Sequence, residues 1–263
     1  MISRDVFGAT GENKSARRTF YEVGAEFILR SASAWKVSSI VLVLLLIAPF
    51  FVIAAGLFSA LLGKATYLWL TGEDGFAENL QIFFSALTFI CALMLIRRYQ
   101  QAGKHLIVVL YVILCFGLLF LIGEEISWGQ RIFGWQTTGV LAEINTQHET
   151  NLHNIVGAKT AFKWVQLLIG AYGTLLPLMF GRWQGNSRVK ELFAAIIPDY
   201  TLIPYFASMF IWKLYRNLLP APANWEFALA EYNEMLELVL AMGIFLFMIF
   251  QLRSDRTSSQ RTD

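Results

Sequence analysis

Charged side chains are scarce in this sequence. They make up 15% of its 263 residues, whereas a soluble globular domain carries about 25%. Apolar residues reach 56%, and they stand in runs of roughly 18 or more, which are typical of membrane-spanning helices. The composition therefore excludes an ordinary soluble domain and predicts a membrane protein.

Cysteine and net charge are also low. Cys91 and Cys115 both fall inside apolar segments, at different expected depths, which favours buried thiols over a disulfide. The net charge of +2 is too small to indicate binding of nucleic acid. The sequence has no internal repeat, and this absence disfavours the inverted-repeat architecture of many transporters.

Six apolar segments remain, and they predict an all-α fold, a polytopic membrane bundle of about six transmembrane helices. The segments cover residues 37–62, 79–96, 106–122, 161–180, 192–212 and 231–252. Together they form one transmembrane domain over 37–252. The preceding residues, 1–36, mix basic and aromatic side chains, as expected for an amphipathic helix lying at the membrane interface. We expect the polar residues 253–263 to form a disordered cytoplasmic tail.

The basic residues are unevenly distributed. Six spans place both termini on one side, and the segments on that side hold 15 of the 21 Lys and Arg residues. The positive-inside rule assigns this side to the cytoplasm. Ten acidic residues then gather near the opposite, periplasmic face with only six basic ones, so that face should attract cations.

The most polar stretch is a periplasmic motif region, residues 123–160. It opens with GEEISWGQR. If the third span continues as a helix, positions i, i+3, i+4 and i+7 share one face, and these positions are Glu124, Ser127, Trp128 and Arg131. Glu125 points elsewhere. The pattern allows a buried ion pair between Glu124 and Arg131, or a functional carboxylate.

Residues 145–154, NTQHETNLHN, allow three local structures. In a helix, Glu149 and His153 stand at i and i+4 and could share a metal ion. In a strand, alternate residues from Asn145 to His153 form a polar comb suited to a sugar or a phosphate. A capping box with Thr146 and Glu149 is the third interpretation. No standard zinc signature is present, so a metal would need further ligands, from among Glu78, Glu124, Glu125 and Glu234.

Two other places carry acids in apolar surroundings. Glu231, Glu234 and Glu237 recur every three residues where the sixth span begins, either as an interfacial helix start or as part of a site. Asp199 lies between Pro198 and Pro204 and predicts a broken helix. That acid is either an ion site or simply an acid near the interface.

Three strings carry a resemblance: EDGFAEN, GEEISWGQRIFG and N-x-Q-x-E-x-N-L-H-N. Across residues 72–154 the chain resembles a group of uncharacterised bacterial multi-pass membrane proteins. The resemblance implies a bacterial inner membrane and assigns no activity.

We carry three functional hypotheses. The first is a metal-dependent enzyme acting on a lipid or lipid-linked substrate at the periplasmic leaflet. A divalent metal would be held by Glu124, Glu149 and His153; Glu125 or His148 would be the general base; and Arg131 would hold an anionic group. Substrate contacts are expected from Asn145, Gln147, Asn151 and Trp128. The second is a non-catalytic assembly or binding subunit, with a protein partner or a homo-oligomer. The third is a transporter or ion pathway, which the one-sided polarity disfavours.

Overall fold

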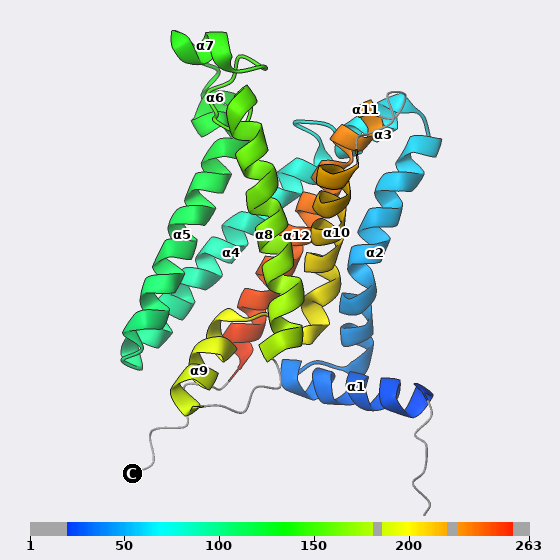
Figure 1. Ribbon diagram of the computed structural model, residues 1–263, viewed down its shortest axis with the longest axis vertical. Coiled ribbons are helices and arrows are strands. Elements are labelled where there is room, and N and C mark those ends of the chain that lie inside the picture. Colours follow the sequence, from blue (N-terminus) through cyan, green and yellow to red (C-terminus); the bar gives the residue numbers. More distant parts are fainter. Residues whose placement is uncertain (1–19, 181–185, 220–225, 255–263) are drawn as a thin grey trace, which may run out of the picture.

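The computed structural model of the chain is helical and describes residues 20–180, 186–219 and 226–254 (Figure 1). The helices that run along the bundle, which we call the long helices, are α2 (Ser39–Leu61), α4 (Phe76–Gln101), α5 (His105–Glu125), α8 (Val156–Phe180), α10 (Ile203–Leu218) and α12 (Asn233–Arg253). The other elements are α1 (Phe20–Trp35), α3 (Lys64–Thr71), η1 (Ser127–Gly129), α6 (Gln130–Phe133), α7 (Val140–Ile144), α9 (Ser187–Ile196), η2 (Tyr200–Leu202) and α11 (Glu226–Glu231). Within these ranges the only strand-like pairing is an isolated bridge between Asn145 and Ile155. The predicted all-α fold is confirmed.

The six long helices run alternately up and down the bundle (Figure 1). Five stretches of the described chain are long and apolar enough to cross a membrane: Ser39–Leu61, Lys64–Gln101, His105–Glu125, Ser187–Leu218 and Asn233–Arg253. The 25-residue α8 runs the length of the bundle beside them. The chain is therefore an integral membrane protein, as its composition predicts.

The two ends of the bundle differ. One end carries α1, which lies across it, and also the last turn of α12 (Figure 1). The other carries α3, α11 and a projecting group of short elements, residues 126–155, which we call the cap (Figure 1). Residues 1–19 and 255–263, which hold much of the predicted amphipathic segment and tail, lie outside the described residues.

Two glycines allow α8 and α10 to approach each other closely. A β-carbon on Gly170 of α8 would lie 2.7 Å from the backbone nitrogen of Phe210 in α10, and one on Gly173 would overlap the ring of Phe206. Small residues allow such close approach between helices in a membrane. α10 packs in turn on α12, whose buried side chains include Met235 and Val239.

The predicted fifth span is not one helix. It divides into α9 and α10, with Pro198 and Asp199 at the break. The Asp199 carboxylate accepts bonds from the backbone nitrogen of Thr201 at 3.0 Å and from its hydroxyl at 2.6 Å, and the Trp35 indole donates to it at 3.4 Å. Asp199 therefore caps the turn η2 and ties it to α1, which supports a structural role rather than an ion site.

Candidate functional site

The helix of the third span ends one residue after Glu124. Ser127 and Trp128 then take positive φ angles of 47° and 51°, a left-handed conformation that side chains with a β-carbon rarely adopt. The chain folds back, and the Trp128 indole donates to Glu124 Oε1 at 2.7 Å. The prediction that Glu124, Ser127, Trp128 and Arg131 share one helical face is wrong, because no continuous helix joins them.

Arg131 bonds to Glu78 in α4 and to Asp74 in the turn before α4, and not to Glu124. Its guanidinium pairs with the carboxylates of Glu78 and Asp74 and donates to the backbone oxygen of Glu125 at 2.6 Å. Burial opposes the charged form of Arg131, but Glu78 and Asp74 outweigh it and raise the pKa of the guanidinium. Arg131 is thus a permanently charged clamp between the cap and α4. The expected ion pair between Glu124 and Arg131 is absent from the described contacts.

Residues 145–155 form a compact loop that is neither helix nor strand. Oδ1 of Asn145 accepts from the backbone nitrogens of Gln147 at 2.9 Å and Glu149 at 3.2 Å. The Asn145 amide donates to Asn151, and the backbone nitrogen of Thr146 donates to the oxygen of Asn154 at 3.1 Å. The helix, the strand and the Thr146 capping box are therefore all wrong. Asn145 organises the turn through its own side chain, as asparagine commonly does.

This loop is fastened to the end of α5 by a second set of bonds. Oε2 of Glu124, a residue that is 1% exposed, accepts from the backbone nitrogens of Leu152 at 2.7 Å and His153 at 2.8 Å. Oε2 of Glu149 accepts from the Ser127 hydroxyl at 2.8 Å and the Asn151 amide at 2.6 Å.

We call these residues the outer cluster: Glu124, Ser127, Asn145, Glu149 and Asn151. Their polar groups bond to each other and to the loop backbone. The outer cluster therefore folds the cap, and its side chains are already engaged within the protein.

The histidines do not join these acids in a metal site. His153 Nδ1 lies 3.5 Å from Glu124 Oε2, but the Glu149 carboxylate is held by Ser127 and Asn151. His148 is exposed, and its Nδ1 lies 2.8 Å from the oxygen of Ala142. Over the ranges that the structure describes, no three His, Cys, Asp or Glu side chains are grouped to hold a metal ion. The predicted set of Glu124, Glu149 and His153 is therefore not assembled.

The predicted substrate-contacting residues are also dispersed. Asn145 and Asn151 are buried in the loop, and Gln147 bonds to Glu73 and Asn154. Trp128 is 49% exposed on the outside of the cap, as expected for an aromatic side chain near a membrane interface. These residues do not converge on one ligand position.

A second polar group lies among the ends of the long helices. Gln81 of α4 is 2% exposed, and its Nε2 donates to Glu125 Oε1 at 3.2 Å and to Glu237 Oε2 at 3.3 Å. Asn233 also donates to Glu237. The two carboxyl groups therefore flank one amide and lie close together.

Two further charged residues complete this group. Lys213 of α10 is 4% exposed and lies within electrostatic range of Glu237 and Glu234 of α12. Glu234 is also within range of Glu125. We call the whole set the inner cluster: Gln81, Glu125, Lys213, Asn233, Glu234 and Glu237.

The inner cluster differs from the outer cluster in having unused acceptors. Oε1 of Gln81 and Oδ1 of Asn233 are buried without a hydrogen-bond partner. Three carboxyl groups add further acceptor oxygens, with Lys213 and Arg131 as cations within electrostatic range. A buried acceptor without a donor costs free energy, so this arrangement has room for a ligand that supplies N–H or O–H groups.

Sequence reasoning named part of the inner cluster, because Glu125, Glu234 and Glu237 stand at the ends of apolar runs. It missed Gln81, Lys213 and Asn233. The available signal was the same for all three: a polar residue within or beside an apolar span is costly and is a candidate for function.

No family model, no curated protein and no solved structure matches the chain.

Proposed function

We propose that this chain is a bacterial inner-membrane protein that binds an amine-bearing lipid or lipid-linked molecule at its inner cluster, from the periplasmic leaflet. One observation carries the proposal. The amide nitrogen of Gln81 joins Glu125 and Glu237, while its buried Oε1 has no partner. An ammonium group beside Gln81 would supply the missing donor.

Charge supports an ammonium group as the recognised feature. Glu234 lies within electrostatic range of both Glu125 and Glu237, and the cations nearest to these three acids are Lys213 and Arg131. Carboxylates near the ends of spanning helices are costly unless a proton or a cation neutralises them. A ligand ammonium would lower that cost and bond to several acceptors at once.

The position of the inner cluster supports a lipid as the source of that ammonium. The cluster lies where α4, α5, α10 and α12 reach the cap end, near the level at which lipid head groups meet hydrocarbon. Lys213 would complement the phosphate of a zwitterionic head group.

Polarity falls off along α4 away from the cap. After Gln81, the next buried positions of α4 are Ser85, Thr88, Cys91 and Ala92. The Thr88 hydroxyl donates to the backbone oxygen of Phe84. The described residues therefore support a one-sided binding site more than a path across the membrane.

A metal-dependent enzyme has less support. Both carboxylate oxygens of Glu124 already accept N–H bonds. The neighbouring carboxyl groups of Glu125 and Glu237 retain the capacity to exchange a proton with a bound amine, so Glu125 remains the best candidate for acid–base chemistry.

The test measures head-group recognition. Purified protein is placed in nanodiscs of phosphatidylglycerol and titrated with phosphatidylethanolamine, and the bound lipid is counted by native mass spectrometry. We expect Gln81→Leu and Glu237→Gln to weaken retention by about tenfold, equivalent to about 1.4 kcal/mol. Glu143→Gln, on the exposed surface of α7, is the matched control and should retain the lipid.

N-acetyl phosphatidylethanolamine, which has no ammonium group, should bind weakly to the wild-type protein. Equal retention of the acetylated and free amines, or equal retention by Gln81→Leu and the control, would overturn the proposal.

A further inference from the structure

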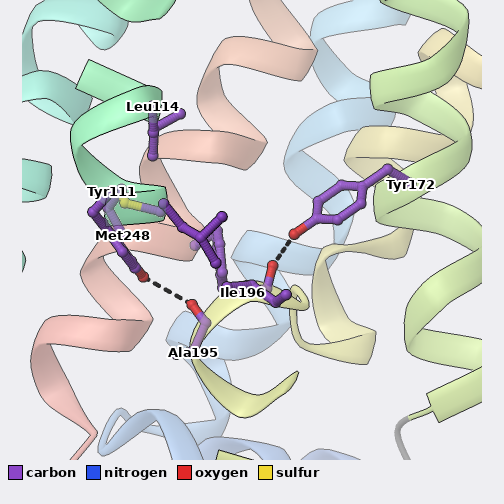
Figure 2. Close-up of a pocket in the computed structure, with 8 residues that line it drawn as sticks. Tyr111, Leu114, Tyr172, Ala195, Ile196 and Met248 are labelled. Atoms are coloured by element: carbon purple, nitrogen blue, oxygen red, sulfur yellow. Dashed lines mark hydrogen bonds between the residues drawn. The ribbon is translucent and has the colours of Figure 1, made fainter. Parts of the chain in front are cut away.

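An apolar pocket of about 250 Å³ lies further along the same helices. It is lined by Leu110, Tyr111 and Leu114 of α5, Tyr172 of α8, Ala195 and Ile196 of α9, and Phe247 and Met248 of α12 (Figure 2). All four elements belong to the membrane-embedded bundle. With the bundle in a membrane, we expect hydrocarbon rather than water around the pocket.

The polar atoms in the wall are already paired. The Tyr111 hydroxyl donates to the oxygen of Ala195 at 2.8 Å, and the Tyr172 hydroxyl donates to the oxygen of Ile196 (Figure 2). A buried water needs two to four polar partners, which this wall does not offer. The chemistry of the pocket suits a hydrocarbon group.

The end of α9 forms the floor of the pocket (Figure 2). Its final carbonyl groups accept from three different helices, because Gln251 of α12 donates to the oxygen of Ala194 at 2.7 Å alongside the two tyrosine bonds. These bonds fix α9 between α5 and α8 and close the pocket on the side of α1. A chain would therefore enter from the side or from the cap end.

The spacing to the inner cluster matches a lipid tail. Leu114 lies eleven residues before Glu125 in α5, which is about 16 Å at 1.5 Å per residue. Phe247 lies ten residues after Glu237 in α12, which is about 15 Å. One leaflet of hydrocarbon is also about 15 Å deep, half of a core of about 30 Å.

We infer that this pocket holds the end of a lipid acyl chain whose head group lies at the inner cluster. The assignment of an acyl chain to the pocket is based on the lining of the pocket, whereas the position of the head group rests on the proposed function.

The experiment uses phosphatidylethanolamine with a diazirine at the end of one acyl chain. The full-length protein is reconstituted with this probe in vesicles of phosphatidylethanolamine and phosphatidylglycerol, irradiated, and mapped by peptide mass spectrometry. We expect crosslinks to concentrate on the pocket-lining parts of α5 and α12. Leu114→Trp places an indole where the end of the acyl chain would lie and should lower the crosslinks by about tenfold, equivalent to about 1.4 kcal/mol of lost binding.

Ile113→Trp is the control, because Ile113 is 61% exposed on the outer face of the same turn and should leave the crosslinks unchanged. Leu110→Trp replaces Leu114→Trp if the latter does not fold. Crosslinks that survive both pocket substitutions, or that spread evenly over outward-facing residues, would overturn the inference.

Glu237→Gln separates the two proposals. Crosslinks that are lost in Leu114→Trp but kept in Glu237→Gln would support the pocket and sink the proposed head-group site. Crosslinks that are lost in Glu237→Gln but kept in Leu114→Trp would support the head-group site and overturn the acyl-chain pocket.

Discussion

At the end of α5, the two oxygens of Glu124 accept three N–H bonds, from the Trp128 indole and from the backbone of Leu152 and His153. In Glu124→Gln, one oxygen becomes an NH2 group that faces N–H donors. At least one buried donor then loses its acceptor, and we expect the free energy of unfolding to fall by about 2 kcal/mol. Hydrogen exchange measured by mass spectrometry should become faster over residues 145–155.

The control for this change is Glu143→Gln, because Glu143 is an exposed acid of the same cap and its neutralisation should leave exchange in the loop unaltered. If both variants exchange at the same rate over residues 145–155, Glu124 does not hold the loop.

The importance of Glu124 could be predicted, but its role could not. A carboxylate at the end of an apolar run is costly and therefore conspicuous. Assigning it to Arg131 required a continuous helix, and nothing in the residue types of Ser127 and Trp128 announces two positive φ angles. Gln81 was missed for another reason. Its partners Glu125 and Glu237 are 44 and 156 residues away, and no local pattern joins them.

Among the elements, α8 and α10 make a contact that leaves no room for a larger side chain at Gly170. A β-carbon on Gly170 would meet the backbone of Phe210, which cannot move without shifting α10. We expect Gly170→Ala to lower the free energy of unfolding by about 1 to 3 kcal/mol, as overpacking does. Thermal unfolding in detergent measures the change.

Gly157→Ala is the matched control in the same helix. Nothing lies within 4 Å of the position that its β-carbon would take, and alanine favours a helix by up to about 1 kcal/mol. No loss of stability is expected there. A loss equal to that of Gly170→Ala would mean that the α8–α10 contact is not the cause.

The elements were predictable where hydrophobic length alone decides the structure, as in α2, α5 and α12. The break between α9 and α10 was also predictable, because Pro198 and Pro204 interrupt the run. The separate direction of α9 was not predictable, because its apolar residues look like the first part of the same membrane span as α10. The loop over residues 145–155 was misread because Asn145 closes its turn through a side chain, without the periodicity of a helix or a strand.

At the scale of the whole molecule, the outer and inner clusters lie at the same end of the bundle and differ in how completely their polar atoms are hydrogen-bonded. The outer cluster is bonded internally and folds the cap, whereas the inner cluster keeps buried acceptors without donors. Composition and the spacing of apolar runs were enough to predict the bundle. They were not enough to separate the two clusters, because that distinction depends on which helices meet.

The orientation of the bundle decides which leaflet supplies the ligand. Cys91 and Cys115 are buried and free, so reporter cysteines can be added singly. Glu143→Cys in the cap and Gln101→Cys at the far end of α4 lie on opposite ends of the bundle. Since 15 of the 21 basic residues fall in the sequence segments that six spans would place on the side of the termini, the positive-inside rule predicts that the end away from the cap faces the cytoplasm.

A membrane-impermeant maleimide should therefore label Glu143→Cys in cells whose outer membrane alone is permeabilised, and it should label Gln101→Cys only after the inner membrane is opened. The unsubstituted protein, with its two buried thiols, is the control for background. The reverse pattern would place the cap in the cytoplasm. The inner cluster would then face the inner leaflet, and the lipid proposal would have to be tested with ligands from that side.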